Sequence, residues 1–187
     1  MTTFTWPEIL AASEKVDWRV QDLMGPEHHF DFDKPFLPES LARVRRLEFL
    51  SPREQLLLNQ IRGHGYLYTF GLVEEFILPF VVDQARAGFG GDTDRDRSLM
   101  TFAEEEAKHI QLFARFRERF RAGFGFECEV IGPPAAVAAA VLAHDALSVG
   151  LVTLQIEWMS QRHYLDSIEN DQALDPRFKS LLRHHWM

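Results

Sequence analysis

Glu106 and His109 are the residues of this chain whose types and spacing most clearly permit chemistry. They form a Glu-x-x-His motif inside residues 103–110, a stretch that favours helix. On a helix, a separation of three residues directs both side chains toward one point in space. Apolar residues share the stripe of Glu106 at helical spacing: Leu99, Ala103, Ile110, Phe113 and Phe120. Burying a carboxylate is costly unless a partner or a metal ion takes its charge, so the motif predicts a metal-binding pair.

Long helices are needed to position such a pair, and the sequence predicts them. N-cap residues, first-turn prolines and terminal glycines mark helices over 52–87, 93–122 and 146–168 and from 176 onward. A shorter helix over 133–143 lies in a long crossover. Residues 1–50, rich in proline and aromatic residues, are expected to form an arm with short helices near 7–15 and 38–47, packed on a helical domain of residues 51–187. The predicted fold class is all-α: a four-helix bundle with an irregular N-terminal arm and an incomplete fourth helix.

The first two long helices place two acids at one height. Glu75 lies 13 residues before Gly88, and Glu106 lies 13 residues after Thr93. At about 1.5 Å per residue, an antiparallel hairpin puts both carboxylates about 20 Å from the turn, where they can face one another. Glu74 is left open as the alternative to Glu75.

The last two helices each add one candidate ligand. Glu157 is the only acid on a stripe along its helix, and it lies 12 residues after Asp145. The other members of that stripe are Leu147, Gly150, Leu154, Gln161, Tyr164 and Ile168. His185 shares the inner face of the fourth helix with Phe178 and Leu181, with His184 left open as its alternative. His185 lies one turn short of the level of the acids, so either the chain is a fragment or its metal site is incomplete.

Composition excludes several classes of function. The net charge of −8 argues against a nucleic-acid partner, which requires a concentrated basic patch. Cys128 is the single cysteine, which fits a reducing cytoplasm. Neither a signal peptide nor an uninterrupted apolar run of membrane-spanning length is recognisable, so we expect a cytoplasmic protein without a membrane partner.

The order Glu75, Glu106–His109, Glu157 and then residues 184–187, His-His-Trp-Met, resembles the ferritin-like di-iron oxygenases, and among them the para-aminobenzoate N-oxygenase family. The resemblance covers roughly residues 50–187. It implies a ferritin-like bundle with Glu75, Glu106, His109, Glu157 and His185 as metal ligands, His185 being an extra histidine one turn before a second Glu-x-x-His. This chain departs from the family pattern because it lacks that second motif.

The resemblance further implies a homodimeric enzyme that activates dioxygen, uses an electron donor and oxidises a small molecule such as an aromatic amine. Mixed carboxylate and imidazole ligands suit two iron ions, or manganese. Two other interpretations stay open. One is an iron-storage protein of the ferritin type, and the other is a non-catalytic helical interaction domain, or an inactive fragment, in which the buried acids pair with Arg or His.

Overall fold

The computed structural model describes residues 4–130 and 132–186, and within these ranges the regular structure is helical, without a strand. This confirms the all-α prediction. The helices are α1 (Trp6–Ser13), α2 (Val20–Met24), α3 (Glu39–Ala42), η1 (Val44–Arg46), α4 (Pro52–Ala87), α5 (Thr93–Phe124), α6 (Pro134–Leu142), α7 (Ala146–His163), η2 (Tyr164–Ile168) and α8 (Pro176–Trp186). The long helices begin and end close to the residues that the capping signals indicate.

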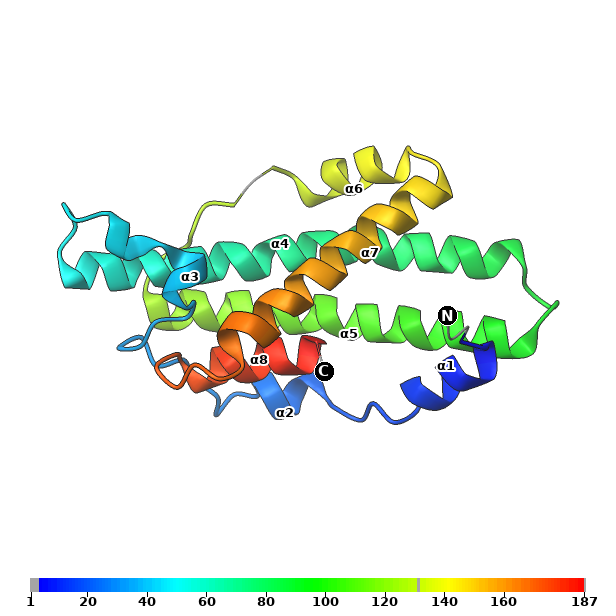
Figure 1. Cartoon of the computed structure of the whole chain (residues 1–187), viewed down its shortest axis with the longest axis horizontal. Helices are drawn as coiled ribbons and strands as arrows, with labels where there is room; N and C mark the ends of the chain where they lie inside the picture. Colours follow the sequence, from blue (N-terminus) through cyan, green and yellow to red (C-terminus); the bar gives the residue numbers. More distant parts are fainter. Residues whose placement is uncertain (1–3, 131, 187) are drawn as a thin grey trace.

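α4 and α5 form an antiparallel hairpin that runs the length of the molecule (Figure 1). α4 begins with a capping box, in which the backbone N–H of Ser51 donates to Glu54 Oε2 at 2.8 Å and the Glu54 N–H donates to Ser51 Oγ at 3.4 Å. Asp92 is the N-cap of α5 and accepts hydrogen bonds from the N–H groups of Asp94 and Arg95, and Gly125 is its C-cap, with a φ of 89°. Only glycine adopts this left-handed conformation without strain. These signals fix the relative height of residues on the two helices.

The remaining helices pack around this hairpin. α6 lies along α4, and α7 runs obliquely across α4 before it continues into the π-helical turn η2. α8 packs against η2 and α2, and its C-terminal end reaches the middle of the hairpin (Figure 1). His185, near that end of α8, is thereby brought to the centre of the molecule.

The N-terminal arm is joined to the helical domain by aromatic packing and by buried amides. Phenylalanines of the arm, α5 and α8 form one cluster: Phe30, Phe32, Phe36, Phe116, Phe120 and Phe178. Asn59 of α4 accepts hydrogen bonds from the backbone N–H groups of Phe36 and Leu37, at 2.8 and 3.0 Å. The next residue, Gln60, donates to two further carbonyls of the arm. Residues of the arm therefore contribute to the hydrophobic core.

Judged by length and apolar composition alone, α4 is the one helix among the described residues that could cross a membrane. Core helices of soluble proteins often have the same length and composition. In this fold α4 contacts α5, α6 and α7, which is the position of a core helix.

Candidate metal site

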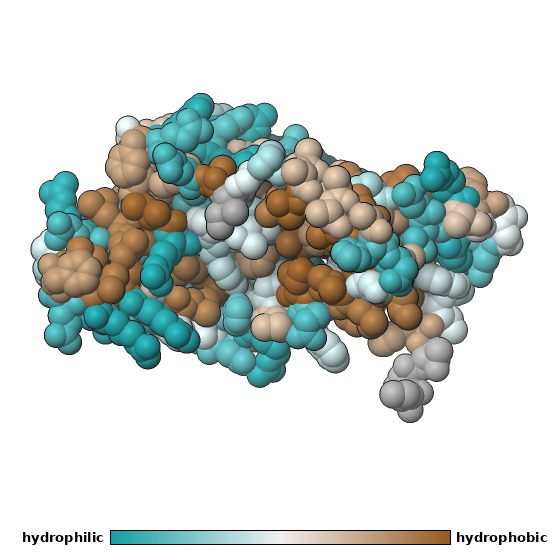
Figure 2. Space-filling model, turned by 90° about the horizontal axis from the view of Figure 1, so that it is seen from above, coloured by the Kyte–Doolittle hydropathy of each residue, from teal (hydrophilic) through white to brown (hydrophobic). Residues whose placement is uncertain are grey.

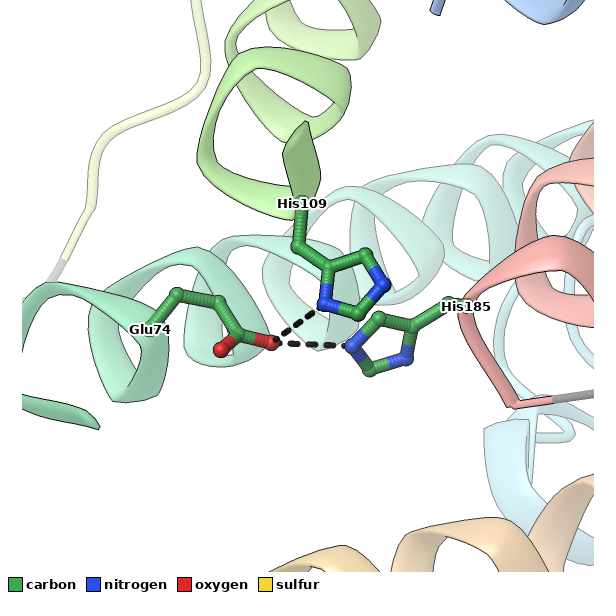
Figure 3. Close-up of side chains that lie close together, drawn as sticks. All are labelled: Glu74, His109 and His185. Carbon is green, nitrogen blue, oxygen red and sulfur yellow. Dashed lines mark hydrogen bonds and ion pairs between the residues drawn. The ribbon is translucent and has the colours of Figure 1, made fainter. Parts of the chain in front are cut away.

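Three side chains from three helices converge at the centre of the molecule: Glu74 of α4, His109 of α5 and His185 of α8 (Figure 3). One potential ligand atom from each lies within 4.8 Å of the others. His185 Nε2 is 2.9 Å from Glu74 Oε1, and His109 Nδ1 is 3.7 Å from the same oxygen. Carboxylate oxygens and imidazole nitrogens that meet in this way can hold a divalent metal ion.

Two further acids belong to this neighbourhood. Glu106, one turn before His109 on α5, has its Oε2 3.2 Å from His109 Nδ1. It also shares a hydrogen bond with the Glu74 carboxyl. Glu157 of α7 lies close to both of these acids. Its charge raises the pKa of Glu74, and the charge of Glu106 in turn raises the pKa of Glu157. The site therefore gathers acids from α4, α5 and α7 with histidines from α5 and α8.

Burial and mutual repulsion divide the protons unequally between Glu74 and Glu106. Burial raises the pKa of Glu74 well above its usual range, and the hydrogen bond and charge of Glu106 raise it further. Burial acts in the same direction on Glu106, but hydrogen bonds from His109 and Glu74 outweigh it and hold the Glu106 pKa below its usual value. Glu74 is thus the acid of the pair that holds a proton more readily, because two neighbouring charged carboxylates repel.

Glu157 and His185 also favour their neutral forms. Burial, followed by the charge of Glu106, raises the pKa of Glu157 to about 7. Burial, followed by the charge of His109, lowers the pKa of His185 well below its usual range. Neutral imidazole is the form that binds a metal ion. A divalent cation would reverse the shift on the acids, because it stabilises the ionised carboxylates.

Buried atoms without partners test whether the residues fit a metal ion. The side chains of Glu74 and His185 are each 1% exposed, yet Glu74 Oε2 and His185 Nδ1 have no hydrogen-bond partner among the described residues. Buried polar atoms in folded proteins are almost always hydrogen-bonded, since an unmet one costs about 1–3 kcal/mol. His185 Nδ1 lies on the side of the ring away from Glu74 (Figure 3), so the unpartnered atom within the cluster is Glu74 Oε2. An unpartnered carboxylate oxygen beside two imidazoles fits a bound cation better than a purely structural cluster.

Aromatic residues enclose the site. The His185 ring packs between Phe70 of α4 and Phe113 of α5, with centroid distances of 5.4 and 5.0 Å. Trp18, from the loop between α1 and α2, stacks on His109 with the rings 5.8 Å apart and 12° from parallel. Lys108 Nζ lies 4.7 Å from the centroid of the Trp18 ring. Sequence reasoning missed Trp18, because nothing in the spacing of the arm indicates which helix it covers.

The predicted ligand Glu75 requires a correction, because Glu74 occupies the expected place. Glu75 is partly exposed, whereas Glu74 is buried and points at both histidines. A signal for this was present: Leu67, Phe70, Glu74, Ile77 and Val81 follow one another at steps of three and four residues, and all five are buried. Counting residues from the turn could not distinguish Glu74 from Glu75, because the count gives the height of a residue along the helix and not the side of the helix on which it lies.

The stripe predicted along α7 is wrong in its N-terminal half. Leu147 and Leu154 are 72% and 56% exposed, and the buried residues are instead Val149, Thr153 and Ser160. α7 carries apolar residues nearly all round, so their spacing did not single out the inner face. Glu157 is nevertheless partly buried and interacts with the other acids.

The expected height of His185 requires a correction: it was predicted one turn short of the acids, yet its Nε2 lies 2.9 Å from Glu74 Oε1. Glu106, His109 and His185 meet at the centre, and His184 instead directs its Nδ1 to the Ser180 carbonyl oxygen at 2.7 Å. Comparison with known proteins adds no relative: no family model, no curated protein and no solved structure matches this chain.

Proposed function

We propose that this chain forms the metal-binding core of a ferritin-like di-iron carboxylate oxidase or oxygenase. The observation that carries the proposal is the buried convergence of Glu74, His109 and His185 beside Glu106 and Glu157. Three acids offset the charge of bound cations, and mixed oxygen and nitrogen ligands suit iron, with manganese as the alternative metal. Two iron ions, when bound, would supply the reduction of dioxygen that oxidises a small molecule such as an aromatic amine.

The protein's own groups would bind, orient and exclude water. Glu74 and Glu157 would give up the protons that burial favours in the metal-free protein, and Glu106 would offer its carboxylate, whose pKa is already held low. His185 and His109 would each present a ring nitrogen. Phe70, Phe113 and Trp186 would keep the site dry and leave apolar surface for an organic substrate.

A metal titration tests this proposal. Chelator-treated protein is titrated with Fe²⁺ under anaerobic conditions in a calorimeter, and we expect at least one ion per chain to bind and protons to be released. Oxygen consumption in the presence of a reductant, with and without an aromatic amine, then tests the oxidation. Absence of metal binding would favour the rival interpretation, a helical interaction domain in which His109 and His185 pair with the acids for structural reasons.

Iron storage is the second rival, and it predicts a different assembly. A storage protein requires a large cage, whereas the proposed enzyme is a cytoplasmic homodimer. Native mass spectrometry separates the two, because a cage contains many copies of the chain.

A further inference from the structure

Thr153 carries a buried hydroxyl that makes no contact in the candidate metal site described above. It lies on the inner face of α7, is 8% exposed, and its Oγ1 has no hydrogen-bond partner among the described residues. A buried hydroxyl without a partner costs free energy, so its presence requires a reason.

Other helical hydroxyls in this fold satisfy themselves on their own helix. Thr69 Oγ1 donates to the Gly65 carbonyl oxygen and Thr101 Oγ1 donates to that of Arg97, both at 3.0 Å. Ser160, also buried on α7, donates to the carbonyl oxygen of Ile156. Thr153 makes no such bond back to the preceding turn, so its hydroxyl remains available to another acceptor.

Glu157 is the acceptor that helix geometry offers. It follows Thr153 by four residues, which places the two side chains one above the other on the same face, with Cβ atoms about 5–6 Å apart. Glu157 also lies among the acids of the metal site. Hydrogen bonds from neighbouring groups to a ligating carboxylate fix its orientation, and their loss typically weakens metal binding about 10–100-fold.

We propose that Thr153 is a positioning residue of the metal site, whose hydroxyl donates a hydrogen bond to the Glu157 carboxylate when an ion is bound. The inference rests on the proposed function. A buried hydroxyl that makes no bond on its own helix and lies four residues before an acid of the site is placed to hold that acid in position.

The test compares Thr153→Val, Thr153→Ser and Ser160→Ala with the wild type. Thr153→Val keeps the shape and removes the hydroxyl, Thr153→Ser restores the hydroxyl, and Ser160→Ala removes the hydroxyl that is satisfied within α7. We expect Thr153→Val to weaken Co²⁺ and Fe²⁺ binding at least about 10-fold and to change the visible spectrum of bound Co²⁺. Thr153→Ser and Ser160→Ala should bind both ions within about threefold of the wild type.

Thermal unfolding of the metal-free variants shows whether a loss of binding is merely a loss of folding. Removing an unpartnered hydroxyl should leave the Tm of Thr153→Val equal to that of the wild type or higher. Metal binding by Thr153→Val as tight as that by Ser160→Ala would overturn this inference and leave the proposed function standing. A lowered metal-free Tm together with no rescue by serine would overturn it as well, and a wild type that binds no metal would overturn both proposals.

Discussion

The protonation of Glu157 links the candidate site to the stability of the metal-free protein. Its pKa is about 7 in the folded chain, against 4.5 for the ordinary value. The folded state therefore holds this proton more tightly than the unfolded state between these two pH values. Since Glu157 binds its proton more tightly in the folded state, its contribution to the free energy of unfolding falls as the pH rises through this window.

We predict that metal-free wild-type protein loses stability between about pH 4.5 and pH 7, by at most about 3 kcal/mol from Glu157. Glu157→Gln should flatten this dependence, because glutamine does not titrate. Denaturant unfolding at several pH values in the presence of a chelator measures it. Glu104→Gln, at an exposed position on α5, serves as the control and should keep the wild-type slope. An unchanged slope in Glu157→Gln would show that its proton is not held more tightly in the folded state.

At the residue scale, sequence reasoning singled out His109 and His185, which converge in the structure, but not Glu74, which meets them. Glu106 and His109 could be predicted because one motif on one helix fixes both their spacing and their direction. To choose between Glu74 and Glu75, one must know which side of α4 faces the core. The stripe of buried residues on α4 shows that side, whereas the number of residues from Gly88 gives only the height along the helix. Trp18 could not be predicted, because its contact with His109 depends on the path of a loop.

At the scale of the elements, α4 must approach both the arm and α8 closely, and Gly63 permits this. A Cβ placed on Gly63 would lie 2.7 Å from Phe36 Cβ and 3.4 Å from Phe178 Cε2. On the same helix, a Cβ placed on Gly65 would meet no atom within 4 Å. Both glycines lie inside α4, but only Gly63 is closely packed against other residues.

We predict that Gly63→Ala destabilises the protein by about 1–3 kcal/mol, because the added methyl group forces the Phe36 ring and α8 outward. Gly65→Ala should instead stabilise it by about 0.5–1 kcal/mol, since alanine loses less backbone entropy in a helix. Denaturant unfolding of both variants checks the pair. Equal effects of the two substitutions would contradict the close approach at Gly63.

Helix boundaries could be predicted from local chemistry, because caps, prolines and glycines act within a few residues. The inner face of α7 could not, since Leu151, Val152, Trp158 and Met159 make its outer face as apolar as its inner one. The short α2 was also missed, because five residues carry too little periodicity. The inner face of α7 and the position of α2 are both determined by tertiary packing and not by local sequence.

At the scale of the whole molecule, the exposed face of α7 is an unusual surface. Six large apolar residues there are each at least 50% exposed: Leu147, Leu151, Val152, Leu154, Trp158 and Met159. Apolar residues also gather on the face of the molecule seen from above (Figure 2). At about 100 Å² each, the six side chains of α7 approach the roughly 800 Å² per partner of a stable interface. Apolar patches of this size usually mark interaction surfaces.

We propose that this face of α7 packs against its copy in a homodimer. Leu154→Asp together with Trp158→Glu should convert a dimer into a monomer, because two charges from each copy would be buried at the contact. Sedimentation equilibrium measures the mass of both proteins. A monomeric wild type, or a double variant that remains dimeric, would contradict this interface, and an unchanged circular dichroism spectrum shows that the variant is folded.

The central claim is that Glu74, with His109 and His185, holds a metal ion at the centre of the hairpin. The most direct test is the Fe²⁺ stoichiometry of Glu74→Gln against Glu75→Gln, measured by anaerobic calorimetry on chelator-treated protein. Adjacent residues receive the same substitution, so differences in expression or charge are matched. We expect Glu75→Gln to bind Fe²⁺ like the wild type and Glu74→Gln to lose that binding. Equal binding by the two variants, or no binding by the wild type, would contradict the account.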